Sequence, residues 1–269
     1  ARRAALAALI LAIAAAAAAA FSLRWRGDEG GSLTFESAAG EVFAVFGNSF
    51  AVCSSTQLQV FDENGRNTLT RAVSAENPGL AASDAVLAVW SAGGDALLVL
   101  DAEGSASELA AEGAVYAVSA NGSGMLAVTT ACEGYRGLVT VYDAALRPVY
   151  RWYAATAWPM AAALSPDGGT LAVLAASEEG GQLRLFSLAG EEELARFVSP
   201  GEVFFDLGWT DGGLCLVSDS RAVFLDASCA LTGERAFGSE RLADYAIDGG
   251  CTVLALSGSD GTRLVSLDA

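Results

Sequence analysis

The sequence contains no histidine and no lysine, and all 15 of its basic residues are arginine. Without histidine there is no Ser-His-Asp or Cys-His relay and no imidazole ligand for a metal ion. Without lysine there is no Schiff base, no anchor for pyridoxal phosphate and no P-loop lysine. Only carboxylate chemistry remains, and the sequence carries no catalytic motif. We therefore expect a protein that is not an enzyme and that uses no cofactor and no metal.

Positive charge is scarce throughout the main part of the chain. Four of the arginines, at positions 2, 3, 24 and 26, flank the first apolar segment, so that after residue 26 there are 32 carboxylates and 11 arginines, a net charge of −21. A surface of this sign repels phosphate backbones and anionic membrane surfaces. We expect no nucleic-acid partner.

The first 26 residues differ in composition from the rest. Residues 4–23 are 20 uncharged positions, and a helix of this length spans roughly 30 Å, the thickness of a bilayer core. Twelve of them are alanine, so the hydrophobic drive for insertion is weak. Two interpretations stay open: a single-pass membrane anchor, which we favour, and a cleaved secretory signal that starts with Arg2 and Arg3. Either one places residues 27–269 outside the cytoplasm if the N-terminus stays inside, but the balanced arginines do not fix the orientation.

Beyond residue 40, short apolar segments recur about every 41 residues. One series usually ends in aspartate, and its last positions are separated by 39, 42, 44, 39 and 42 residues. A second series, such as LAVLA at 171–175, occurs six times in step with the first. Asn-Gly or Asp-Gly dipeptides precede four members of this second series. These dipeptides favour the tight turns of β-hairpins. The last residues of the six members of the first series are Asp62, Asp101, Asp143, Ser187, Asp226 and Asp268.

Four short strands per unit are typical of a β-propeller blade, whose sheet is covered on both faces by its neighbours. The strands are accordingly apolar almost throughout instead of alternating. We predict an all-β chain: a β-propeller of about six four-stranded antiparallel blades, preceded by one N-terminal transmembrane or signal helix. The predicted units span residues 42–77, 78–114, 115–158, 159–201, 202–240 and 241–269.

The sixth predicted unit lacks a fourth strand, which would leave one sheet edge unpaired. Residues 32–37 are the one unassigned strand-like segment after residue 26, and Leu33 and Phe35 lie on one face of it. We predict that this segment pairs antiparallel with residues 264–268 and closes the ring.

One repeat carries a family resemblance. The segment SPDGGTLAVLA at 165–175, a turn followed by an apolar strand, resembles the repeat of WD-repeat-like bacterial β-propellers. An apolar anchor followed by such a propeller is also similar to bacterial membrane-anchored propeller-like domains of unknown function. The resemblance implies an architecture and a place at the membrane, and it implies no activity.

In this strand order, the loops between second and third strands and the connections between blades emerge on the same rim, which is where propellers usually bind. The loops of units three and four are rich there in aromatic and arginine residues, which are enriched at interface hot spots. The competing interpretation is that Trp152 and Tyr153 finish an outer strand and that the charges are solvated. The candidate binding face consists of Glu133, Tyr135, Arg136, Trp152, Tyr153, Trp158, Glu178 and Glu179.

The repeated aspartates and the cysteines are interpreted as structural. One aspartate per blade is too dispersed for a metal site, and aspartate is common where a turn begins. The segment at 62–65 lacks the alternating ligands of a calcium loop. The five cysteines form no C-x-x-C pair, and Cys53 and Cys215 fall in apolar strands, which predicts core positions. Cys229 and Cys251 fall near one rim in adjacent blades, a placement that permits a disulfide.

Three functions stay open. The leading hypothesis is a noncatalytic extracytoplasmic binding or scaffold module, held at the cell membrane by residues 4–23, with a protein, a peptide or an envelope polymer as partner. The second is a propeller enzyme of the quinoprotein or lactonase type that uses carboxylates such as Asp206, Asp244 or Glu202. The third is an extracytoplasmic sensor domain with a cytoplasmic partner region.

Overall fold

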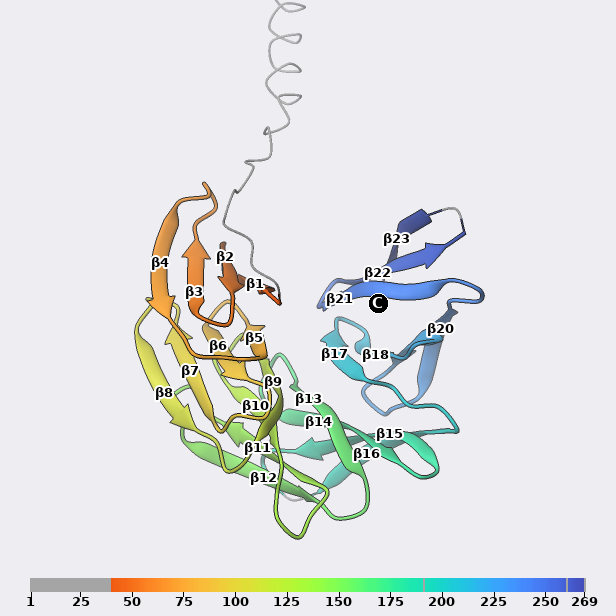
Figure 1. Ribbon diagram of the computed structural model, residues 1–269. Helices are drawn as coiled ribbons and strands as arrows, with labels where there is room; N and C mark the ends of the chain where they lie inside the picture. The colour runs from red at the N-terminus through yellow and green to blue at the C-terminus, as the bar shows by residue number, and fades with distance from the viewer. Residues whose placement is uncertain (1–39, 191, 260, 269) are drawn as a thin grey trace, which may run out of the picture.

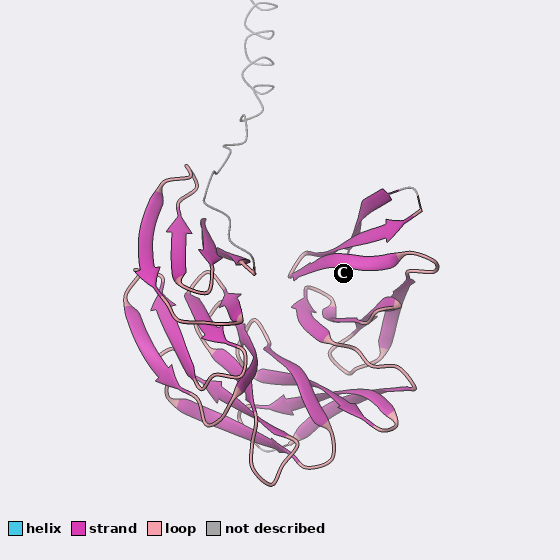
Figure 2. Ribbon diagram, in the orientation of Figure 1, coloured by secondary structure: helices cyan, strands magenta, loops and turns pink. Residues whose placement is uncertain are grey.

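The computed structural model describes residues 40–268 apart from 191 and 260, and the regular elements in this part are 23 β-strands in six antiparallel sheets (Figures 1 and 2). Blade one contains β1 (Val42–Phe46), β2 (Ser49–Cys53), β3 (Gln57–Phe61) and β4 (Asn67–Ala72). Blade two contains β5 (Pro78–Ala82), β6 (Val86–Ser91), β7 (Ala96–Asp101) and β8 (Ala106–Ala110). Blade three contains β9 (Val115–Ala120), β10 (Leu126–Thr130), β11 (Gly137–Tyr142) and β12 (Pro148–Ala154).

The remaining blades repeat this order. Blade four contains β13 (Trp158–Leu164), β14 (Thr170–Ser177), β15 (Gly180–Ser187) and β16 (Glu193–Pro200). Blade five contains β17 (Asp206–Thr210), β18 (Gly213–Val217), β19 (Arg221–Leu225) and β20 (Leu231–Ala236). Blade six contains β21 (Arg241–Asp248), β22 (Cys251–Gly258) and β23 (Gly261–Asp268).

The blades are arranged around a common centre. In every sheet the strands follow chain order, and Figure 1 shows the first strand of each blade innermost. The inner strands of consecutive blades contact one another from β1 to β21. This arrangement confirms the predicted all-β fold, a six-bladed β-propeller with antiparallel blades.

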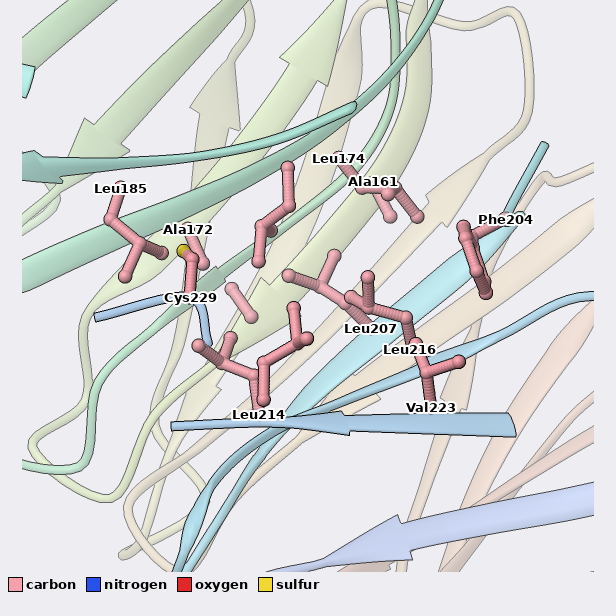
Figure 3. Close-up of a cluster of buried hydrophobic side chains, with 13 residues drawn as sticks. Ala161, Ala172, Leu174, Leu185, Phe204, Leu207, Leu214, Leu216, Val223 and Cys229 are labelled. Atoms are coloured by element: carbon pink, nitrogen blue, oxygen red, sulfur yellow. The ribbon is translucent and has the colours of Figure 1, made fainter. Parts of the chain in front are cut away.

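Burial on both faces explains why the central strands lack alternation. All five residues of β10 are buried, because Val128 packs in a cluster with blade two whereas Ala127 packs in a cluster with blade four. Figure 3 shows the equivalent cluster between blades four and five, where Leu174 and Leu185 meet Leu207. Each blade therefore depends on its neighbours for its apolar burial, as expected for a propeller.

Blade six has three strands in the part of the chain that the structure describes, and there β23 pairs with β22 alone. Its Leu264 is 75% exposed. The residues at the same repeat position in the other blades are all buried: Leu58, Leu97, Val139, Leu183 and Ala222. Residues 32–37 lie outside the described residues, so their pairing with β23 stays a prediction.

The aspartates that end the third strands of blades one, two, three and five form turns, as predicted. The Oδ1 atom of Asp62 accepts the N–H groups of Asn64 and Arg66, at 2.9 and 2.8 Å. Asp143 and Asp226 each accept the N–H groups two and four residues further on in the same way. The hydrogen bonds from Arg66 and Asn64 lower the pKa of Asp62. These carboxylates thus stabilise the turns that follow the third strands.

The left-handed residue of the hairpin turns falls where the sequence predicts it in blade four, at Gly168 with a φ of 71°, but elsewhere in blade three. In the turn at 121–125 the positive φ belongs to Gly124, two positions after the dipeptide's Gly122. Two equivalent positions hold Leu146 and Cys229, with φ of 58° and 64°. Non-glycine residues rarely adopt this conformation. Both side chains pack into clusters between blades, and this burial offsets the backbone strain.

The cysteines are free thiols, including Cys229 and Cys251. Cys53 and Cys215 are buried in the core as predicted, and burial raises the pKa of each thiol to about 11. In the described part of the chain, no helix has the length and apolar character needed to cross a membrane, and the predicted anchor at 4–23 lies outside that part.

Candidate functional site

The connections between blades and the loops between second and third strands lie on one rim, because adjacent strands in every blade are antiparallel. We call this the entry rim, since each inner strand begins there. In blades three to five it contains residues 131–136 between β10 and β11, 155–157 between β12 and β13, 178–179 between β14 and β15, 201–205 between β16 and β17, and 218–220 between β18 and β19.

Two tyrosines of the candidate face lie against each other on this rim. The ring centroids of Tyr135 and Tyr153 are 4.9 Å apart, and the two side chains are 48% and 44% exposed. The loop is held to the end of β12 because the backbone N–H of Arg136 donates to the carbonyl of Ala154 at 2.7 Å. The pairing of β11 with β12 therefore brings together Tyr135 and Tyr153, which are 18 positions apart in the sequence.

Arg136 lies over the indole ring of Trp158, with its guanidinium carbon 4.2 Å from the ring centroid. Trp158 is the first residue of β13 and is 42% exposed. The next residue after Arg136 is Gly137, where an added Cβ would lie 2.6 Å from Cγ of Pro159. Blade three thus approaches blade four closely at this point, and the cation–π contact joins them.

Trp152 is not part of this exposed group. It lies in the outer strand β12, where neighbouring side chains point to opposite faces, so that it faces away from Tyr153. It is half-buried against Phe186 of blade four, at 5.6 Å between ring centroids, and the guanidinium of Arg184 lies 5.5 Å from its ring. Trp152 therefore packs between blades three and four.

The three acidic residues of the candidate face are exposed on the same rim. Glu133 lies in the loop of Tyr135, and Glu178 and Glu179 form the turn between β14 and β15. Trp158 pairs with Ala176 next to that turn. None of the three carboxylates makes an ion pair within the described residues.

Further exposed apolar residues belong to the rim but were not among the predicted site residues, and they include Val203 in the connection between β16 and β17. Tyr116 and Met160 lie near the starts of β9 and β13, and Phe205 precedes β17. The register of blade three passes from Ala117 to Val115, and that of blade four from Pro159 to Ala161, so Tyr116 and Met160 are the extra residues of β-bulges. Bulges redirect a side chain out of the regular alternation, and an almost uniformly apolar strand gives no sign of them.

A second polar cluster lies on the entry rim at blade five. The carboxylate of Glu202 accepts hydrogen bonds from Ser218 at 2.7 Å and from the guanidinium of Arg221 at 2.7 Å, and Ser220 also donates to it. Burial alone would raise the pKa of Glu202, but the bonds from Arg221 and the two serines outweigh it and hold the pKa at about 2. The cluster fastens the connection between blades four and five to the loop between β18 and β19.

Replacing Arg221 tests how much this cluster stabilises the fold. The pKa of Glu202 lies below its ordinary value of 4.5, so its contribution is present above pH 4.5 and is lost as the pH falls toward 2. We expect Arg221→Gln to lower the free energy of unfolding by about 1–2 kcal/mol at pH 7, because it leaves Glu202 poorly paired. Urea unfolding between pH 7 and pH 3 should also show a weaker pH dependence in the variant.

The matched control is Glu234→Gln, which removes only the outer ion-pair partner of Arg221. That carboxylate is half exposed, and pairs of this kind contribute about 0.5 kcal/mol or less. Equal losses in the two variants would contradict the assigned role of Glu202.

The other carboxylates considered for catalysis each have their own partner. Tyr245 of β21 donates its hydroxyl to Oδ2 of Asp206 at 2.7 Å, across blades five and six, and burial raises the pKa of Asp206. Asp244 is exposed and accepts the N–H of Tyr245 at 2.9 Å. Among the described residues, no three acidic or cysteine side chains are grouped as metal ligands.

Comparisons with known proteins identify a family and a fold. Residues 30–186 match a family of unknown function, DUF5711. A search of curated proteins finds no significant match. The β-propeller domain of Cps50 (Swd1) from Myceliophteria thermophila is similar in structure, with a TM-score of 0.65 and 13% identity over 87% of this chain and 88% of that chain.

Two further solved structures contain similar chains. One is a mitotic checkpoint complex, with a TM-score of 0.67 and 17% identity over 87% of this chain and 76% of that chain. The other is hydrazine synthase from Kuenenia stuttgartiensis, with a TM-score of 0.67 and 15% identity over 90% of this chain and 80% of that chain. At these identities the likeness shows the propeller fold alone.

Proposed function

Because the chain belongs to the DUF5711 family, whose function is unknown, and folds as a six-bladed propeller, we propose that it is a noncatalytic binding or scaffold module that holds a protein, a peptide or an envelope polymer. The observation that carries the proposal is the exposed group on the entry rim, in which Tyr135 contacts Tyr153 in a tilted ring pair and Arg136 lies over Trp158. Tryptophan, tyrosine and arginine dominate the energetics of protein interfaces.

We also propose that the propeller is held at the cell membrane, outside the cytoplasm, by residues 4–23. The 20 uncharged positions of this segment, flanked by arginine, support it. A similar chain occurs in a mitotic checkpoint complex, and this use of the fold inside a complex supports a scaffold role.

One capture experiment tests the binding and the location together. Wall-stripped cells that produce the tagged full chain are treated with external protease or left untreated, and the chain is then captured from detergent-solubilised membranes. We expect the wild type to retain a stable partner in untreated cells. The amount of captured partner should fall at least tenfold in the double variant Tyr153→Ala with Trp158→Ala, since each hot-spot side chain contributes about 2 kcal/mol or more. External protease should remove the propeller.

The control is Val149→Ala with Leu231→Ala, two exposed apolar residues of outer strands away from the entry rim. This pair should retain the partner. Equal retention by all variants would contradict the assigned site, and protection from external protease would contradict the location. Turnover in a substrate screen would favour the enzyme hypothesis instead.

A further inference from the structure

The exposed aromatic side chains are concentrated on one side of the molecule. Six aromatic residues are among the exposed large apolar side chains of the described part, and the one outside blades three to five is Phe43 at the start of β1, which stacks on Phe50 of blade one. A contiguous exposed apolar patch marks an interaction surface. The other five lie on the entry rim of blades three to five, where Met160 joins them: Tyr116, Tyr135, Tyr153, Trp158 and Phe205.

The charge around this aromatic group is negative. Four carboxylates in the rim loops of blades three, four and five make no ion pair within the described residues: Glu133, Glu178, Glu179 and Asp219. Arg221 is engaged by Glu202 and Glu234. Arg136 is therefore the one rim arginine of these loops whose charge no carboxylate offsets, among the residues described.

Aromatic faces beside free carboxylates match the chemistry of arginine and lysine. The face of an indole or phenol ring attracts a cation, and a nearby carboxylate pairs with it. The chain itself shows the first contact, because the guanidinium of Arg136 lies on the ring of Trp158. An open recess of about 550 Å³ in blade five combines apolar walls, Val203 and Phe205, with the carboxylate of Asp219. Arg221 also lines it, but its charge is offset by its ion pairs with Glu202 and Glu234. The recess suits a side chain with an aliphatic stem and a charged end.

We infer that the partner held on the entry rim is a basic polypeptide segment, in which arginine or lysine alternates with apolar residues. The inference rests on the proposed binding function and specifies its partner. The net charge of −21 after residue 26 acts in the same direction, since it attracts cationic segments at long range and repels anionic polymers.

Defined peptides test the charge preference. Fluorescein-labelled 12-residue peptides of alternating Arg-Leu, Gln-Leu and Glu-Leu are titrated with the detergent-purified full chain, and binding is followed by anisotropy at low and at physiological salt. We expect the Arg-Leu peptide to bind at least tenfold more tightly than the other two, with an affinity that falls as salt rises.

Two quadruple variants with the same change in charge separate a site from a general field. The rim variant carries Glu133→Gln, Glu178→Gln, Glu179→Gln and Asp219→Asn. The control variant carries Glu63→Gln, Asp84→Asn, Glu103→Gln and Glu192→Gln, which are exposed residues in turns of the opposite rim. The rim variant should bind the Arg-Leu peptide roughly tenfold more weakly, whereas the control should change by about twofold or less.

Equal losses in the two quadruple variants would overturn the inference, because the peptide would then follow the overall charge and not the rim. Preference for the neutral or the acidic peptide, or no binding of any peptide, would overturn it as well. These outcomes leave the proposed function intact if a partner is still captured through Tyr153 and Trp158. If no partner is captured through Tyr153 and Trp158, both the proposed function and the inferred basic partner are wrong.

Discussion

Deleting residues 27–38 is expected to lower the thermal unfolding midpoint of the propeller by on the order of 10 °C or more. In the described part of the chain, β23 pairs on one side only, and its Leu264 is 75% exposed while five equivalent residues are buried. If residues 32–37 form the missing fourth strand, the deletion exposes this edge and removes Leu33 and Phe35, each worth about 1.5–3 kcal/mol when buried. Differential scanning calorimetry of the full and shortened chains measures the effect.

Point variants distinguish a closing strand from a linker. Leu33→Ser with Phe35→Ser should reproduce most of the loss, whereas Thr34→Ser, on the other face of the segment, should leave the midpoint within about 2 °C. Leu264→Ala tests ring closure separately, because the five equivalent residues are buried against the next blade, so that Leu264 is buried only if blade six packs on blade one. A buried leucine costs about 2–5 kcal/mol to truncate and an exposed one costs little. An unchanged midpoint after the deletion would show that the ring is not closed by this segment.

The fold could be predicted because two independent sequence patterns follow the same repeat of about 41 residues. Third strands that end in aspartate and apolar second strands run in step, and both patterns follow from the blade: Asp62 opens a turn, and β10 is covered on both faces. The bulges at Tyr116 and Met160 could not be predicted, since a bulge changes register without changing composition. The left-handed Leu146 and Cys229 were also hidden, because their strain is offset by contacts between blades.

The candidate site could be predicted in part. Composition alone pointed to the loops of Tyr135 and Trp158, and the pairing of β11 with β12 then places Tyr153 beside Tyr135. β12 is the outer strand that the competing interpretation assigned to Trp152 and Tyr153. Strand alternation within it places the packed Trp152 and the exposed Tyr153 on opposite faces. The bonds between Glu202 and Arg221 could not be found, since they cross from one blade's connection to the next blade's loop, 19 residues away.

Replacing Gly180 by alanine is expected to have the second large effect on stability. The turn that carries Glu178 and Glu179 packs directly against the connection between β16 and β17. Gly180 has a φ of +130°, and an added Cβ would lie 2.3 Å from the carbonyl oxygen of Ser199 and 2.7 Å from the backbone nitrogen of Gly201. Both neighbours are backbone atoms, and one of them also holds the turn, since the N–H of Gly201 donates to the carbonyl of Glu179 at 2.9 Å.

The clash therefore cannot be relieved by moving a flexible side chain. Backbone strain of about 1–3 kcal/mol and overpacking of a similar size add up to a loss of at least ~3 kcal/mol in the free energy of unfolding. Urea unfolding at pH 7 measures it, with Gly122→Ala as the control, since Gly122 has no atom within 4 Å of an added Cβ and no left-handed φ. The control should change by about 0.5 kcal/mol or less. Equal stability of the two variants would show that the rim tolerates a displaced turn, and the fixed placement of Glu178 and Glu179 beside Trp158 would then be wrong.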